Sequence, residues 1–298
     1  MTETVRVAVP RKGRPLEAVL ERFATTDEAA EVADEITSTL RFEKSVTKGH
    51  THPDADVYQR LSEYSDLSDP AAPEYTLLRD DREGMPRRIV FDSVELEYDE
   101  VTIHLVGREE PFRALRTHEF GLGFDSADLV LEEVVKLQPE GLESIADINA
   151  RIDPMDTDVR VVSGLGDTVY HTLMADPEIL PPKSNLDRDF VADYAGDLCI
   201  SPRYERLVEA VLGTRCLDDV SFVYPEEGPE EEASIADTGL GVYLTMTGST
   251  ARDFGLVLGE HLFPSETVLM ENVAEATEAA EAVKEIVAGP ELETALKI

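Results

Sequence analysis

Cysteine and lysine are both scarce in this sequence of 298 residues, which holds two cysteines, Cys199 and Cys216, and only seven lysines. Two cysteines are too few for a disulfide framework, and neither has other residues nearby at metal-ligand spacing. We therefore expect both cysteines to be small buried residues.

Long apolar runs are missing as well. No stretch approaches the length of a membrane span, and the N-terminus, MTETVRVAVPRKGRP, lacks the apolar core of a secretory signal. The sequence therefore predicts a cytoplasmic protein.

Positive charge is the third shortage, since 63 acidic residues face 27 basic ones and the formal net charge is −36. The chain should still fold, because 42% of its residues are hydrophobic and the acids are spread throughout. Acid spread over a surface with few lysines is typical of proteins that stay soluble in concentrated salt, where screening shortens charge repulsion. We interpret the host as halophilic. The same charge disfavours binding to nucleic acid or to an anionic membrane.

Side chains for nucleophilic catalysis do not gather in the sequence either. No Ser/His/Asp or Cys/His constellation emerges, and the isolated His118 and His171 are interpreted as structural. Residues 50–56, HTHPDAD, resemble a metal cluster in composition only. Their candidate ligands alternate along an extended chain without a later partner, which favours a solvated loop.

What the sequence does contain is a repeated order of strand, loop and helix. Apolar runs end in loops rich in Gly, Ser, Thr or Asp and continue with helical spacing in the segments 5–23, 157–174, 197–213 and 242–256. In 157–174, Asp167 or Thr168 is the predicted helix cap, and Asn272 is the predicted cap of a last helix closed by Gly289 and Pro290. The segment 44–86 is predicted to be irregular except for a short helix near 58–64.

This alternation predicts an α/β fold of two lobes, with parallel or mixed sheets flanked by helices. In such sheets, ligands bind where loops leave the carboxyl ends of strands. The loops of this chain are therefore the first candidates for a functional site.

One such loop, Thr247-Gly248-Ser249-Thr250, follows the apolar run 242–246. Backbone N–H groups at a helix N-terminus suit a phosphate, hydroxyls add donors, and Gly248 would let the backbone approach the anion closely. The alternative is that Ser249 or Thr250 only caps the helix, which is the commoner explanation of such spacing.

A second candidate is the basic turn after the first strand, residues 10–14, PRKGR. Lys12 offers a mobile cation and Arg14 a planar, bidentate one, and together they could hold phosphates or a purine nucleotide. The alternative is a solvated basic turn.

Taken in order, these segments resemble the catalytic portion of ATP phosphoribosyltransferase, the enzyme that opens histidine biosynthesis. VRVAVPRKGRPLEAVLERF (5–23) resembles the family's first strand, Lys-Gly-Arg turn and first helix. HEFGLGFDSADLVLEE (118–133) resembles its Ala-Asp-Leu-Gly-Ile-Thr-Gly-x-Asp stretch. IADTGLGVYLTMTGSTARDFGLVLGEHLFPSETVLMEN (235–272) resembles its phosphate loop, the next helix and the following strand.

The resemblance implies a two-lobed fold like that of type II periplasmic binding proteins, with 1–133 and 252–298 in lobe I and 134–251 in lobe II. It implies that 5-phosphoribosyl 1-diphosphate, ATP and magnesium bind between the lobes. Thr247, Gly248, Ser249 and Thr250 would then hold the phosphate of the phosphoribosyl donor. Lys12 and Arg14 would face the nucleotide, and Asp237 would contact the metal or the ribose.

The implied reaction is a glycosyl transfer in which a purine nitrogen displaces diphosphate, and it needs no covalent nucleophile. Tyr243 stands where the family usually has a second carboxylate. This departure leaves open a non-catalytic relative that senses a phosphorylated metabolite or regulates a partner. The expected partners are small phosphorylated molecules and, because the family's regulatory domain finds no match, a regulatory subunit or further copies of the chain.

If the halophilic interpretation is right, transfer from molar KCl to low salt will lower the melting temperature sharply, because repulsion among the surplus carboxylates is then unscreened. Thermal melts at stepped KCl concentrations measure this dependence. A melting temperature that does not change with KCl would contradict the interpretation.

Overall fold

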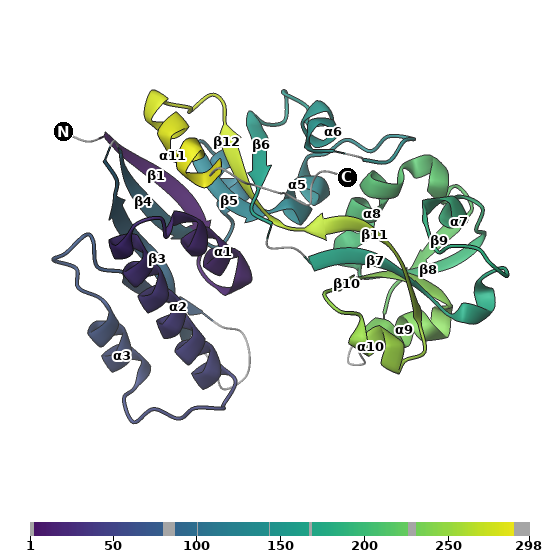
Figure 1. Cartoon of the computed structure of the whole chain (residues 1–298), viewed down its shortest axis with the longest axis horizontal. Coiled ribbons are helices and arrows are strands. Elements are labelled where there is room, and N and C mark those ends of the chain that lie inside the picture. The colour runs from purple at the N-terminus through teal and green to yellow at the C-terminus, as the bar shows by residue number, and fades with distance from the viewer. Residues whose placement is uncertain are drawn as a thin grey trace. The chain divides into compact units, whose positions relative to one another are not determined.

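The computed structural model (Figure 1) describes residues 3–79, 87–99, 101–142, 144–166, 169–225 and 231–288. The predicted caps Asp167 and Thr168 and the predicted helix end at Gly289 and Pro290 lie outside these residues. The chain divides into two compact units, which we describe separately. Among the described residues, no helix is both long and apolar enough to cross a membrane.

The first unit contains a seven-stranded mixed sheet in the order β2-β3-β4-β1-β5-β12-β6. β1 pairs in parallel with β4 and β5, whereas β3 pairs antiparallel with β2 and β4, and β12 pairs antiparallel with β6. The strands are β1 (Glu3–Pro10), β2 (Glu74–Arg79), β3 (Arg87–Glu97), β4 (Val101–Arg108), β5 (Leu122–Ser126), β6 (Val159–Gly164) and β12 (Thr267–Asn272).

Helices cover both faces of this sheet. They are α1 (Gly13–Phe23), α2 (Asp27–Thr47), α3 (Val57–Tyr64), α4 (Pro111–Arg116) and α11 (Glu278–Ala288). The alternate residues Val5, Val7 and Val9 of β1 belong to one apolar cluster with α1, α2 and α11. On the other face, Gly123 leaves room for Leu115 of α4, because a Cβ atom at Gly123 would overlap that side chain.

The second unit contains a five-stranded mixed sheet in the order β11-β7-β10-β8-β9. β8 pairs in parallel with β10 and β9, and β7 pairs antiparallel with β10 and β11. The strands are β7 (Val169–Ala175), β8 (Gly196–Ile200), β9 (Val220–Val223), β10 (Leu240–Thr245) and β11 (Val257–Ser265). The helices are α5 (Ala127–Glu133), α6 (Ile145–Ala150), α7 (Arg188–Ala192), α8 (Glu205–Leu212), α9 (Glu231–Thr238) and α10 (Ser249–Asp253), with short 3-10 helices at Pro177–Ile179, Pro202–Tyr204 and Thr214–Leu217.

The α/β class with mixed sheets is therefore confirmed, but several local predictions are wrong. The segment 44–86, predicted to be irregular except for a short helix, also contains the end of α2 and the strand β2. The helix predicted to follow the glycines of 157–174 is strand β7, whose interior position buries nearly every side chain and so hides the alternation of a strand. Asn272 ends β12 instead of capping α11. It is fully buried, and its Nδ2 donates to the Leu115 carbonyl at 2.8 Å. Cys199 is buried as predicted, whereas Cys216 is only half-buried.

The bounds of the two units differ from the lobes expected from the sequence. Described residues up to Asp125, from 158 to 166 and from Thr267 onward form the first unit. Helix α5 lies in the second unit because it packs against α8 and β11, and β11 lies there because it pairs with β7. Strand β6 lies in the first unit because it pairs with β12, far along the chain.

A buried ion pair joins α2 to α3 in the first unit. Glu43 accepts hydrogen bonds from Arg60 Nε at 2.7 Å and Nη2 at 3.0 Å, and their side chains are only 4% and 9% exposed. The hydrogen bond to Glu43 raises the pKa of Arg60. Burial, together with the negative charge of Glu43, raises the pKa of Tyr64 to about 12.

We expect Glu43→Ala to lower the free energy of unfolding by about 3 kcal/mol, because it leaves the Arg60 guanidinium buried without its counter-charge. Glu17→Ala is the matched control, since Glu17 pairs with Arg41 on an exposed surface and should cost less than about 1 kcal/mol. Denaturant unfolding at constant KCl measures both. Equal costs would show that burial of the Glu43 pair contributes nothing.

Candidate functional site

The turn 247–250 lies on the surface of the second unit and joins β10 to α10. α10 begins at Ser249, and its N-cap is Gly248, with φ 64° and ψ 23° in the left-handed region. No side chain caps α10. The N–H of Gly248 instead donates to Thr245 Oγ1 at 2.8 Å, and that of Ser249 to Thr247 Oγ1 at 3.4 Å. The alternative explanation, that Ser249 or Thr250 caps the helix with its side chain, is therefore wrong.

The exposed surface of this turn is polar and carries one nearby cation. Thr247 and Ser249 are exposed, and their hydroxyls lie 3.2 Å apart. Arg252 Nη2 donates to the Thr247 carbonyl at 2.6 Å, which holds the guanidinium beside the turn. Within the described residues, no acceptor is paired with the Thr250 amide. The turn can therefore offer backbone and hydroxyl donors to an anion.

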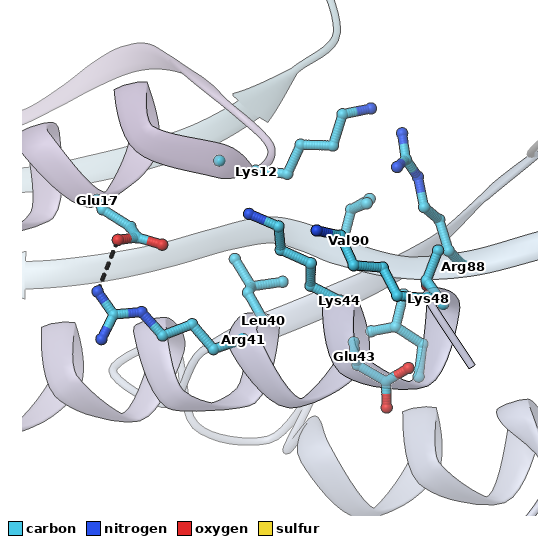
Figure 2. Close-up of a pocket in the computed structure, with 12 residues that line it drawn as sticks. Lys12, Glu17, Leu40, Arg41, Glu43, Lys44, Lys48, Arg88 and Val90 are labelled. Carbon is cyan, nitrogen blue, oxygen red and sulfur yellow. Dashed lines mark hydrogen bonds and ion pairs between the residues drawn. The ribbon is translucent and has the colours of Figure 1, made fainter. Parts of the chain in front are cut away.

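The basic turn of residues 10–14 lies in the first unit, at the carboxyl end of β1. Arg11 anchors it, because its Nε donates to the Gly107 carbonyl at 3.1 Å. Lys12 is the N-cap residue of α1, and its Nζ lies 3.5 Å from a carboxylate oxygen of Glu109. Lys12 lines a pocket together with residues of α2 and β3, whereas Arg14 is exposed and is not among the lining residues (Figure 2).

Asp237 and the turn 247–250 belong to the same unit but to opposite ends of β10. Asp237 is exposed near the end of α9, just before β10 begins, and the turn follows the other end of that strand. Six strand residues span roughly 20 Å. The structure therefore does not bring Asp237 together with the predicted phosphate turn.

Another carboxylate, that of Glu231, contacts β10 nearer to the turn 247–250 than Asp237 does. Glu231 is the first residue of α9 and hydrogen-bonds to the hydroxyl of Tyr243 on β10. Burial, followed by the negative charge of Glu231, raises the pKa of Tyr243 to about 12. No sequence signal points to this contact, because Glu231 is one of several glutamates in the acidic run at 226–232.

A buried polar cluster lies at the start of α5. Asp128 Oδ2 accepts a hydrogen bond from Ser265 Oγ at 2.9 Å and lies 3.4 Å from His171 Nε2. The His171 ring is fully buried, with the Tyr204 ring edge-on to it at a centroid distance of 4.6 Å. Burial is the first cause that raises the pKa of Glu132, and the charge of Asp128 adds to it. His171, interpreted as isolated, is thus part of a carboxylate cluster.

Magnesium does not fit the residue expected to hold it. Asp237 is remote from the turn along β10, and among the described residues no three His, Cys, Asp or Glu side chains gather as a metal site. Magnesium is often held by one or two carboxylates together with substrate phosphates. Asp237 is not placed to share phosphates with the turn 247–250.

These features define the class of the protein. It is an α/β protein of two compact units, each built on a mixed sheet, with the second unit inserted into the first and polar turns where β1 and β10 end. The Halobacterial ATP phosphoribosyltransferase family matches residues 1–298, and the chain belongs to that family. No curated protein is significantly similar to the chain in sequence.

Solved structures similar to the chain include an ATP phosphoribosyl transferase (HisG:HisZ) complex from Thermotoga maritima, at 15% identity and a TM-score of 0.35, over 79% of this chain and 96% of that one. The periplasmic aliphatic sulphonate binding protein SsuA from Escherichia coli is similar at 10% identity and a TM-score of 0.39, over 97% of this chain and 68% of that one. Because both TM-scores are below 0.5, family membership rests on the family match alone.

Gly248→Ala tests the left-handed turn. We expect it to lower the free energy of unfolding by about 2–3 kcal/mol, because a Cβ adds backbone strain and overlaps Leu258. Gly255→Ala is the matched control, since Gly255 has φ 78° but no atom within 4 Å of the added Cβ. It should cost about 1 kcal/mol. Equal losses in denaturant unfolding would rule out the packing part of this explanation.

Proposed function

We propose that the protein is a phosphoribosyltransferase that uses 5-phosphoribosyl 1-diphosphate and ATP. Its membership of the Halobacterial ATP phosphoribosyltransferase family over residues 1–298 is the observation that carries the proposal. In the reaction, a purine ring nitrogen of ATP forms a bond to the anomeric carbon of the ribose. The bond from that carbon to oxygen breaks, and its electron pair leaves with diphosphate.

The proposed role of the turn 247–250 is to hold the donor's phosphate. Its exposed hydroxyls, the Thr250 amide and the nearby Arg252 support this role, because fixed donors stabilise negative charge without reorganising during the reaction. The transition state has oxocarbenium character, so the protein mainly aligns the two ligands and stabilises the leaving group. A covalent nucleophile is not required.

Glu231 is proposed to supply the carboxylate that the family's pattern places near Tyr243. Its contact with Tyr243 supports this role, because the carboxylate reaches β10 from a different element. There it can accept hydrogen bonds from the ribose hydroxyls and stabilise positive charge that develops on the ribose ring. No residue is assigned to hold magnesium.

Lys12 and Arg14 are proposed to bind the nucleotide. The exposure of Arg14 and the position of Lys12 at a pocket support this proposal. A non-catalytic sensor has no specific structural observation in its favour. A regulatory subunit or a homo-oligomer stays a prediction.

The activity is tested by measuring diphosphate release from 5-phosphoribosyl 1-diphosphate and ATP with magnesium in molar KCl. Ser249→Ala/Thr250→Ala should raise the KM for the phosphoribosyl donor about tenfold, because two hydroxyl donors to a charged phosphate are lost. Ser221→Ala, which removes an exposed hydroxyl from the edge strand β9, is the control and should leave that KM unchanged.

In the same assay, Glu231→Gln should lower kcat about tenfold or more with a smaller effect on the KM for the donor, because the lost charge acts mainly in the transition state. Calorimetric binding of donor and ATP by the wild-type protein without diphosphate release would refute the enzyme and favour a sensor. An unchanged kcat in Glu231→Gln would remove Glu231 from the mechanism but leave the proposed reaction.

A further inference from the structure

A pocket in the first unit collects basic side chains that the sequence does not bring together. It lies among the start of α1, the last turns of α2 and strand β3, and its volume is about 280 Å³ (Figure 2). Its charged lining residues are Lys12, Arg41, Lys44, Lys48 and Arg88, against two acids, Glu17 and Glu43. Three of the seven lysines in the chain therefore line one pocket.

Both acidic residues of the pocket are engaged with arginines. Glu17 Oε2 lies 2.8 Å from Arg41 Nη2. Glu43 accepts two hydrogen bonds from Arg60, at 2.7 and 3.0 Å, on the buried side of α2. Their negative charge is therefore already paired with a cation.

Lys44 and Lys48, in contrast, contact no carboxylate in the part of the chain that the structure describes. Both side chains are exposed on the side of α2 that faces the basic turn of residues 10–14, where Lys12 lies (Figure 2). In a protein with 63 acidic and 27 basic residues, two neighbouring lysines without a carboxylate partner among the described residues are unexpected. An anion from solution would balance their charge.

The end of a helix favours lysine by itself, because cations there interact well with the helix dipole. That effect accounts for lysine in the last turn of α2, but not for the face on which these lysines lie. Lysines four positions apart repel one another on a helix surface. A bound anion would relieve the repulsion between Lys44 and Lys48. Arg88 and Lys12 line the same pocket, and Lys12 also pairs with Glu109 at 3.5 Å.

The size and lining of the pocket limit the ligand. Its volume is just below the roughly 300–1,000 Å³ typical of small-molecule sites, so it suits part of a nucleotide better than a whole one. None of its twelve lining residues is aromatic, so a purine base would find no ring to stack on. Ammonium and guanidinium groups are the usual partners of phosphate oxygens.

We propose that this pocket binds a linear polyphosphate, two or three phosphates long, through Lys44, Lys48 and Arg88 beside Lys12. The group could belong to a nucleoside triphosphate or be free diphosphate, and both have the same charged oxygens. The inference rests on the proposed function only for the source of that group.

Calorimetric titration of the full chain in molar KCl tests the pocket, with inorganic diphosphate, ATP and AMP as separate ligands. In Lys44→Gln/Lys48→Gln, the affinity for ATP, diphosphate or both should fall at least about tenfold, since charge-assisted hydrogen bonds are lost. AMP should bind much more weakly than ATP to the wild-type protein. Lys136→Gln/Lys183→Gln, which removes two exposed lysines of the second unit, is the charge-matched control.

The outcomes separate the two sources and the two proposals. A loss for diphosphate as well as ATP identifies the phosphate chain itself as the ligand, and a loss for ATP alone identifies the nucleotide. Unchanged affinity for both, or AMP binding as tight as ATP binding, overturns the inference. If wild-type protein binds ATP through these lysines but releases no diphosphate from the phosphoribosyl donor, the proposed function fails and this inference stands.

Discussion

The insertion of β12 between β5 and β6 is the backbone pairing on which the first unit depends. Its two ends are fixed by hydrogen bonds from the Leu165 amide to the Thr267 carbonyl, at 2.9 Å, and from the Asn272 amide to the Gly121 carbonyl, at 2.8 Å. Without this strand, β6 would have no neighbour linking it to the rest of the sheet. The chain therefore leaves and re-enters the first unit, and the second unit is an insertion within it.

Charge is the second constraint, because the protein has few basic residues. Several arginines are placed where they satisfy buried or half-buried oxygens. Arg188 pairs with Glu260 and donates to the carbonyls of Leu142, Val211 and Leu262. Lys44 and Lys48 depart from this pattern, since they face a pocket without carboxylate partners among the described residues. Arginines such as Arg188 bind oxygens of the protein itself, whereas Lys44 and Lys48 are available to bind an anionic ligand.

The candidate sites differ in whether their residues are consecutive in the chain. The turn after β10 and the basic turn after β1 are each contained in a few consecutive residues, so their donors can be recognised in the sequence. Glu231 and Tyr243 lie on two successive elements and meet only because α9 packs against β10. The departure at Tyr243, where the family's pattern has a carboxylate, gains a physical interpretation from this contact.

Errors in the sequence-based prediction have the same origin. β7 was predicted as a helix because a strand buried on both faces has no polar alternation. The cap predicted at Asn272 failed because that side chain is needed inside the sheet, where it bonds to Leu115. In each case, neighbours that come from elsewhere in the chain override local preference.

The sequence by itself determined the α/β class, several strand–loop–helix segments, the polar turns at strand ends and the family resemblance that the whole-chain match confirms. Periodicity, glycine and proline are local signals, and these features depend on local signals. Only the tertiary structure decided which unit each strand joins, that Asp237 and the phosphate turn lie at opposite ends of β10, and that Lys44 and Lys48 share a pocket with Lys12. Strand pairing and helix packing bring together residues from distant segments, and the order of residues along a chain does not encode which segments will meet.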